Sequence, residues 1–191
     1  MKKGLLILLS GPSGVGKGTV RKIVFNDDSL NLAYSISMTT RSPREKEVNG
    51  IDYFFVSEDE FIKRLNNNEF LEYAKFVGNY YGTPKNYVEK LREQGKNVFL
   101  EIEVQGAKQV LEQYKDDDRV VSIFLLPPSL DELEKRIRGR RSEDEHIIQE
   151  RLSKAKREID LKGNYQYSVL NDNIYKASEK IVSIIRENLN K

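Results

Sequence analysis

Near the start of the chain, seven residues have the types and spacing of a phosphate-binding loop: Gly11-Pro12-Ser13-Gly14-Val15-Gly16-Lys17. Glycines in such a loop let backbone N–H groups converge on an anion, and the N-terminus of the following helix adds partial positive charge. The lysine side chain then reaches the β- and γ-phosphates of a nucleoside triphosphate. An ordinary glycine-rich turn is the alternative. Against it, an apolar run at 5–9 and a helical pattern at 20–24 supply the strand and helix that the motif requires.

The residue after the lysine departs from the usual pattern of this motif. Gly18 stands where Ser or Thr is expected, and the hydroxyl comes one place later, at Thr19. In phosphate-binding loops that hydroxyl normally binds Mg²⁺. Because Mg²⁺ tolerates several water ligands, we expect either water or Thr19 to take the missing place.

A second group of residues could bind another anion. Arg41 and Arg44 lie three apart among hydroxyls and a proline, and the planar fork of Arg matches two phosphate oxygens. Phenol groups at Tyr53 and Tyr81 and a carboxylate at Glu72 lie in the same region. Taken singly, an arginine pair is typical of a solvated loop and a tyrosine of a half-buried packing position.

The elements that must position these groups follow from apolar patterns. Near-continuous apolar runs at 5–9, 97–102, 120–126 and 167–170 are typical of strands in a parallel sheet covered on both faces. Helical patterns lie between or after them, at 86–94, 106–114, 129–138, 146–160 and 173–188. This alternation predicts a doubly wound α/β core.

Two stretches do not follow that alternation. Residues 35–85 are polar and aromatic-rich, with short strands expected at 52–56 and 70–74, a helix near 58–67 and a glycine turn at 79–83. They predict an inserted subdomain. Residues 131–162 carry dense charge of both signs and predict two solvated helices joined by a mobile turn.

Composition bounds the class of protein. The chain has 191 residues, 38% of them hydrophobic and 32% charged, which predicts one soluble globular domain. A net charge of +2 gives no argument for a nucleic acid or a membrane as partner. No cysteine is present, which excludes disulfides and thiolate metal sites. The N-terminal apolar run is shorter than the roughly 7–15 residues of a signal core, so we expect a cytoplasmic protein.

Six motifs together resemble those of guanylate kinase. They are the loop at 11–17, the segment 37–44, Gly50-x-x-Tyr53-x-Phe55-Val56, Phe70-x-Glu72, residues 78–82 and Val104-Gln105-Gly106. Their order and spacing match the family from about residue 4 to residue 172. The resemblance implies a P-loop core whose parallel sheet is flanked by helices, an inserted mixed-strand GMP-binding subdomain and a helical lid. It also implies the reaction of ATP and GMP to ADP and GDP, with dGMP as a weaker acceptor.

The resemblance also implies an acceptor site. The phosphate of GMP is expected to meet Arg41, Arg44, Tyr53 and Tyr81. Guanine is expected to receive a hydrogen bond at O6 from Ser37 and to donate to Glu72 from N1–H and the 2-amino group, with Thr83 and Glu103 near the base. Adenine has neither donor, and a buried acceptor left unpaired discriminates strongly against the wrong base.

The residues that take part in phosphoryl transfer are also taken from the resemblance. The resemblance implies catalytic roles for Lys17, Arg136, Arg140 and Arg151, magnesium near Glu101, and adenine near Asn171. ATP is otherwise expected on residues 11–19. Glu101 and Glu103 stand where the family commonly has Asp, which puts coordination distances in question, and Arg141 replaces a usual glycine. His146, the single histidine, is expected to be exposed and without a chemical role.

The implied division is a core at 1–34, 91–127 and 160–191, a GMP-binding part at 35–90 and a lid at 128–159, within one domain. Other readings are a catalytically dead binding module and a kinase for another monophosphate. The retained lysine and lid arginines argue against the first, and Ser37 with Glu72 against the second. Interleaved acidic and basic residues disfavour a nucleic-acid binder. The oligomeric state stays open.

Overall fold

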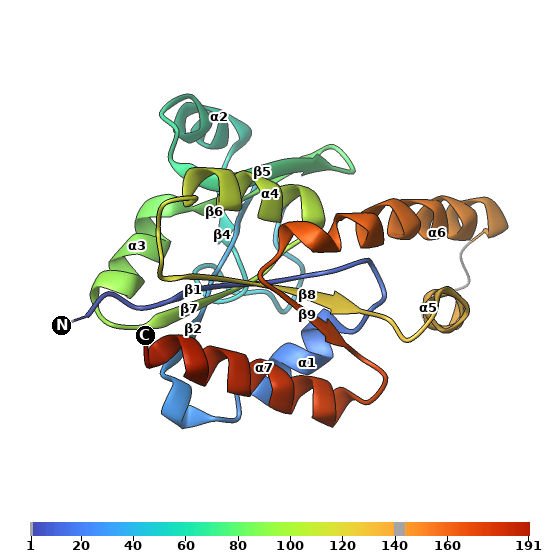
Figure 1. The fold of residues 1–191 in the computed structure, drawn as a ribbon. Coiled ribbons are helices and arrows are strands. Elements are labelled where there is room, and N and C mark those ends of the chain that lie inside the picture. Colours follow the sequence, from blue (N-terminus) through green and yellow to red (C-terminus); the bar gives the residue numbers. More distant parts are fainter. Residues whose placement is uncertain (1, 140–143) are drawn as a thin grey trace.

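A computed structural model describes residues 2–139 and 144–191. Its centre is a sheet of five parallel strands in the order β2-β7-β1-β8-β9 (Figure 1). These are β1 (Leu6–Ser10), β2 (Leu32–Tyr34), β7 (Asn97–Glu101), β8 (Val120–Leu126) and β9 (Tyr167–Leu170). The doubly wound α/β core expected from the sequence is confirmed. The short edge strand β2 was not predicted.

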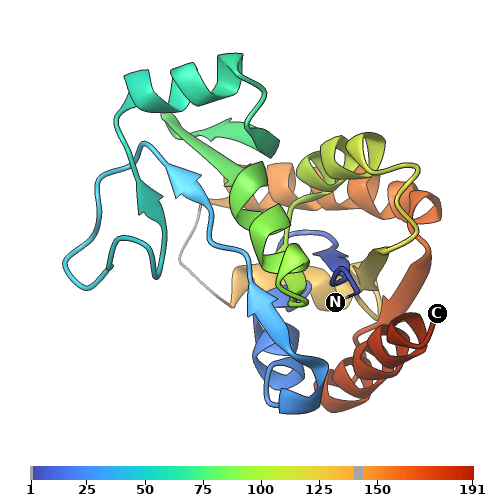
Figure 2. The ribbon, with the colours of Figure 1, turned by 90° about the vertical axis from the view of Figure 1, so that its left-hand side faces the viewer.

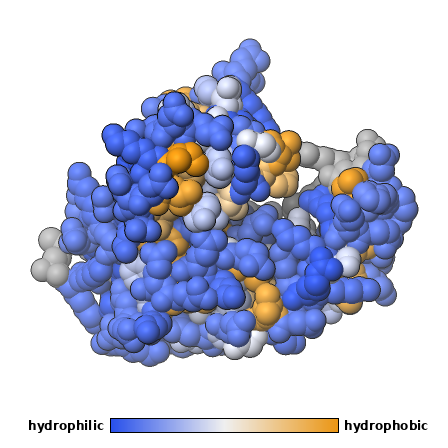
Figure 3. Space-filling view, turned by 90° about the horizontal axis from the view of Figure 1, so that it is seen from above, coloured by the Kyte–Doolittle hydropathy of each residue, from blue (hydrophilic) through white to orange (hydrophobic). Residues whose placement is uncertain are grey.

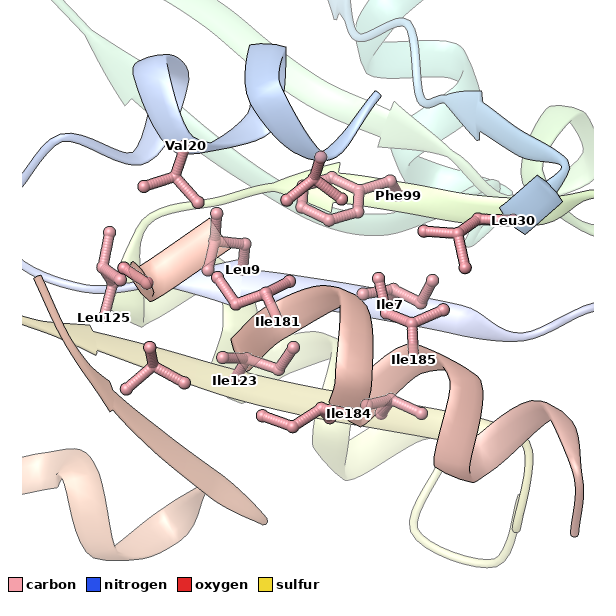
Figure 4. Close-up of a cluster of buried hydrophobic side chains, with 14 of the residues drawn as sticks. Ile7, Leu9, Val20, Leu30, Phe99, Ile123, Leu125, Ile181, Ile184 and Ile185 are labelled. Carbon is pink, nitrogen blue, oxygen red and sulfur yellow. The ribbon is translucent and has the colours of Figure 1, made fainter. Parts of the chain in front are cut away.

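Helices cover both faces of this sheet. One face carries α1 (Lys17–Val24) and α7 (Ile174–Leu189), and the other carries α3 (Lys85–Glu93) and α4 (Val104–Gln113). Alternate residues of β1 serve the two faces: Ile7 and Leu9 pack with α1 and α7 (Figure 4), whereas Leu6 and Leu8 pack with α3 and α4. Because both faces are buried, the strands read as continuous apolar runs.

A second, mixed sheet lies beside the core (Figure 2), with the strand order β4-β3-β6-β5. Its strands are β3 (Met38–Thr39), β4 (Phe54–Phe55), β5 (Phe70–Phe76) and β6 (Asn79–Pro84), and α2 (Glu58–Asn66) packs on it through a small aromatic cluster. Single-turn 3-10 helices at Asp28–Leu30 and Leu161–Asn164 complete the core connections.

The prediction of a glycine turn at 79–83 was wrong, because these residues form strand β6. The turn lies just before it, at Val77 and Gly78, which both have positive φ. Gly82 serves a different purpose. A side chain there would come within 2.8 Å of the Phe70 ring, so glycine is needed for close packing between β5 and β6.

The charged segment forms α5 (Leu130–Arg138) and α6 (Glu145–Asp160). The two helices are not wholly solvated, because they share a buried apolar cluster made of Leu133, Ile137, Ile148, Leu152 and Ala155. Seen from the side of α2 and α6, the surface is mostly hydrophilic with scattered apolar groups (Figure 3). Arg140 and Arg141 lie outside the described residues. Across the residues that the structure describes, no helix has the length and apolar character needed to cross a membrane.

Candidate active site

The phosphate-binding loop lies at the carboxyl end of β1, between the ends of its neighbours β7 and β8. Ligands of open α/β sheets bind at this edge. Gly14 and Gly16 adopt φ of 84° and 104°, and α1 begins directly afterwards at Lys17. The strand–loop–helix context predicted for this motif is therefore present.

Lys17 points back into its own loop. Its Nζ donates to the carbonyl of Gly11 at 2.7 Å and to that of Pro12 at 3.2 Å. Burial lowers the pKa of Lys17, while the carboxylates of Glu101 and Glu103 act in the opposite direction. The ammonium is thus held at the centre of the loop, where a phosphate would meet it.

Three side chains from distant segments hold the loop. Asn171, which is buried, donates from Nδ2 to the carbonyl of Val15 at 2.8 Å. Arg136 on α5 donates from Nη1 to the carbonyl of Val15 at 3.4 Å and from Nη2 to the carbonyl of Asn171 at 3.3 Å. Arg151 of α6 donates from Nη2 to Oγ of Ser13 at 2.9 Å. Arg136 and Arg151, two of the lid arginines expected to be catalytic, therefore lie against the phosphate-binding loop.

The two acidic residues beyond β7 have different partners. Glu101 ends the strand and accepts a hydrogen bond at 3.0 Å from Nε of Arg21, which lies on α1. Glu103 precedes α4 and pairs with Nζ of Lys154 on α6, also at 3.0 Å. Both line one cavity with the phosphate-binding loop, so the expected acidic pair beside the loop is in place, although strand β7 ends two residues before Glu103.

That cavity has a volume of about 700 Å³ and reaches from the loop to three residues expected at the acceptor site, Ser37, Tyr53 and Glu103. The other expected acceptor residues do not line it: Arg41, Arg44, Glu72, Tyr81 and Thr83. Its wall includes Ser37 and Tyr53, both predicted, and several residues that were not, among them Tyr34, Ser35, Asp52 and Glu158. Within the described chain, Oγ of Ser35 is buried without a hydrogen-bond partner.

The carboxylate expected to bind the guanine base has little free space around it. Glu72 on β5 accepts a hydrogen bond at 2.6 Å from Oγ1 of Thr83, which is buried on β6. A side chain at Gly106 would come within 2.8 Å of its other oxygen. Burial raises the pKa of Glu72, the Thr83 hydroxyl acts against that shift, and the charge of Glu103 adds to it.

The expected phosphate clamp is partly assembled. The Arg41 guanidinium lies 5.5 Å from the centre of the Tyr53 ring, and the Tyr53 and Tyr81 rings are 6.2 Å apart. Glu47, not predicted, pairs with Nη2 of Arg41 at 2.8 Å and accepts from the backbone N–H of Arg44. This ion pair raises the pKa of Arg41. The side chain of Arg44 is exposed.

A magnesium ion would find few protein ligands here. Across residues 2–139 and 144–191, no group of three or more His, Cys, Asp or Glu could hold a metal. Mg²⁺ in phosphoryl-transfer sites is usually bound by one or two carboxylates together with substrate phosphates. The Glu101 carboxylate, which lines the cavity beside the loop, fits this pattern.

Several cavity residues escaped sequence reasoning, although a signal existed for some. Arg151, Lys154 and Glu158 are spaced at i, i+3 and i+7 on α6 and so share one helix face. Lys154 pairs with Glu158 at 3.6 Å, and burial raises the pKa of Glu158. His146 is exposed, as expected, and lies 3.4 Å from Glu150.

Comparisons with known proteins agree with the family resemblance of the sequence motifs. A family model described as guanylate kinase matches residues 3–188. A guanylate kinase from Mycoplasma capricolum is 56% identical over 185 residues, which are 97% of this chain and 61% of that protein's length. One from Bacillus cereus is 55% identical over 184 residues, 96% of this chain and 88% of that protein. The crystal structure of guanylate kinase from Anaplasma phagocytophilum aligns with a TM-score of 0.76 at 32% identity, covering all of this chain and 89% of the other.

Proposed function

Because the chain belongs to the guanylate kinase family, we propose that it transfers the γ-phosphoryl group of ATP to GMP and, more weakly, to dGMP. The observation that carries the proposal is the continuous cavity of about 700 Å³, because its wall joins the phosphate-binding loop to Ser37 and Tyr53. Two nucleotides can therefore meet within one cavity. Phosphoryl transfer consists mainly of positioning and charge neutralisation, for which such a space is required.

On the donor side, the loop from Gly11 to Thr19 would bind the phosphates of ATP, with Lys17 at the β- and γ-phosphates. Arg136 and Arg151 would stabilise the charge on the phosphoryl group in transit, and the resemblance adds Arg140. Glu101 would hold the magnesium that accompanies ATP, and that ion supplies further neutralisation of phosphate charge. We keep adenine near Asn171 as part of the proposal.

On the acceptor side, Glu72 would accept hydrogen bonds from N1–H and the 2-amino group of guanine. One of its oxygens is already oriented by Thr83 at 2.6 Å, so the carboxylate has a fixed direction before GMP arrives. Ser37 and Glu103 would complete the contacts to the base. Arg41, Arg44, Tyr53 and Tyr81 would bind the phosphate, and the closeness of the Arg41 guanidinium and the Tyr81 ring to the Tyr53 ring supports this part of the proposal.

We propose that the three parts of the chain divide this work: the core at 1–34, 91–127 and 160–191 binds ATP, residues 35–90 bind GMP, and residues 128–159 close over both. The contacts of Arg136 and Arg151 with the loop support a lid role for α5 and α6. Closure would exclude water and so protect ATP from hydrolysis. A cytoplasmic location stays a prediction.

The test is an assay of ADP formation with ATP and each nucleoside monophosphate in turn. We expect GMP to be the best acceptor, dGMP to be weaker and AMP to react orders of magnitude more slowly. Equal turnover of AMP would contradict the guanine assignment. Binding of GMP and ATP without any turnover would favour a binding module, the second function that the sequence left open.

A further inference from the structure

One sequence motif, Val104-Gln105-Gly106, has no part in the proposed phosphoryl transfer. It opens α4, and Gly106 is buried in the first turn of that helix. The φ of Gly106 lies outside the left-handed region, so any residue could adopt its backbone conformation. Glycine is also the poorest helix former apart from proline. The backbone therefore gives no reason for a glycine at this position, whereas the space around it does.

A side chain at position 106 would collide with two neighbours. A Cβ there would lie 2.8 Å from Oε2 of Glu72 and 2.9 Å from Cγ1 of Ile102. Non-bonded carbon atoms in proteins pack at about 3.5–4.0 Å, so a neighbour would have to move. The Glu72 carboxylate thus fills room that only a glycine leaves.

Two glutamines fix the distance between α4 and the strand that carries this carboxylate. Gln109 accepts a hydrogen bond from the N–H of Tyr73 and donates one to the Tyr73 carbonyl, both at 3.1 Å. Gln113 donates from Nε2 to the carbonyl of Leu71 at 2.7 Å. The glutamines follow the glycine by three and seven residues and so share its helix face, which lies against β5 (Figure 1). Because α4 is fastened to the backbone on both sides of Glu72, it cannot move away without breaking these bonds.

Of the two neighbours, the carboxylate is the one that can move. Ile102 is 7% exposed and belongs to the apolar cluster beneath α4, where close packing resists displacement. The Glu72 carboxylate ends a longer side chain and is held by the hydrogen bond at 2.6 Å from Oγ1 of Thr83. We therefore expect a side chain at position 106 to turn the carboxylate away from Thr83 while the fold stays in place.

We propose that Gly106 is a positioning residue for guanine specificity: without a side chain there, the Glu72 carboxylate stays on Thr83, in the orientation that meets N1–H and the 2-amino group of guanine. The inference rests on the proposed function, since it requires that Glu72 binds the base. Gly106 acts through the carboxylate and does not touch the nucleotide itself.

Steady-state kinetics of Gly106→Ala in the whole protein test this role. We expect the KM for GMP to rise about 30-fold, because the displaced carboxylate no longer faces the base. The kcat should stay within about threefold and the KM for ATP should not change, because a contact with the base is lost equally from ground state and transition state. The matched control is Gly163→Ala, since Gly163 also has φ outside the left-handed region and a Cβ there meets nothing within 4 Å. It should leave the KM for GMP as in the wild type.

Two further backgrounds separate the carboxylate from other effects. In Glu72→Gln, the addition of Gly106→Ala should change the KM for GMP by less than about threefold, because the carboxylate is already lost. Ile102→Ala removes the apolar atoms that a Cβ at position 106 would meet. In that background Gly106→Ala should still raise the KM about 30-fold relative to Ile102→Ala alone. The same background provides an assay if Gly106→Ala by itself is too unstable, with thermal unfolding without nucleotide as the measure of stability.

Three results would overturn the inference. They are an unchanged KM for GMP in Gly106→Ala, losses that simply multiply between Gly106→Ala and Glu72→Gln, and a KM effect that disappears in the Ile102→Ala background. The last two would mean that Gly106 acts through helix packing and not through the carboxylate. None of the three affects the proposed function, which fails if the wild type forms no GDP from ATP and GMP.

Discussion

Arg151 on α6 donates a hydrogen bond from Nη2 to Oγ of Ser13 at 2.9 Å, although 138 residues separate the two in the chain. The contact joins α6 to the phosphate-binding loop. A guanidinium already directed at the loop needs little reorganisation when phosphates arrive. Such preorganised donors contribute most where charge develops in the transition state.

We therefore expect Arg151→Ala to lower kcat about 100-fold while the KM for GMP changes little. The matched control is Arg157→Ala, on the same helix, where the arginine is exposed and donates a hydrogen bond to Oγ of Ser153 at 3.1 Å. Steady-state kinetics of both variants provide the measurement. Equal losses in the two variants would mean that the helix, and not the contact with Ser13, matters.

Lys17→Ala should reduce phosphoryl transfer by roughly 1,000-fold or more, because the loop loses its only side-chain cation at the phosphates. The carbonyls of Gly11 and Pro12 also lose their donor. The measurement is single-turnover formation of GDP, with Lys180→Ala, exposed on α7, as control. Near-normal transfer by Lys17→Ala would remove the loop from the mechanism.

Glu72→Gln should mainly affect acceptor choice. The amide oxygen of glutamine can still accept from Thr83, but the amide nitrogen presents donors to the two guanine donors. We expect the ratio of kcat/KM for GMP over AMP to fall by about 100-fold or more. Glu58→Gln, exposed at the start of α2, is the control. An unchanged ratio would show that another group reads guanine.

The same substitution should raise stability at neutral and higher pH. Burial raises the pKa of Glu72 in the folded protein, so the folded state binds the proton more tightly than the unfolded state. The free energy of unfolding of the wild type therefore falls as the pH rises from the ordinary pKa of a glutamate toward the raised pKa of Glu72. Urea unfolding without nucleotide should show Glu72→Gln more stable at pH 8 by about 1 kcal/mol, with a smaller difference at pH 5. A difference that grows on acidification would contradict the assignment.

Asn171→Ala distinguishes loop support from base recognition. Its Nδ2 bond to the Val15 carbonyl is buried, and losing it should destabilise the protein by about 1–2 kcal/mol. If the residue acts through the loop, KM should rise equally for ATP and GTP as donors, with the KM for GMP unchanged. A selective loss of preference for ATP would assign Asn171 to the adenine.

Much of the fold could be predicted from local pattern, and most of the site could not. Continuous apolar runs identify β1, β7 and β8 because those strands are buried on both faces. Strand β6 was misread because Tyr80, Tyr81 and Gly82 have the composition of a turn, and only its pairing with β5 makes it a strand. The burial of Asn171 beneath the loop depends on β9 lying beside β8, a long-range arrangement that no local spacing encodes.

Ion pairs between side chains were still harder to predict from the sequence. Glu47 follows Arg44 by three residues, but nothing in that spacing indicates that its carboxylate turns back to Arg41. The pairing of Lys154 with Glu103 depends on α6 crossing the end of β7, which is set by the packing of the whole lid.

The apolar cluster shared by α5 and α6 gives the lid an interior of its own. Its shape is maintained by Leu133, Ile137, Ile148, Leu152 and Ala155, whereas its grip on the core is made by Arg136, Arg151 and Lys154. One set of side chains therefore holds α5 and α6 together, and a separate set holds the two helices against the core. We expect substitution of these three residues to change how tightly α5 and α6 bind the core, in either direction, while the apolar cluster between the two helices stays intact.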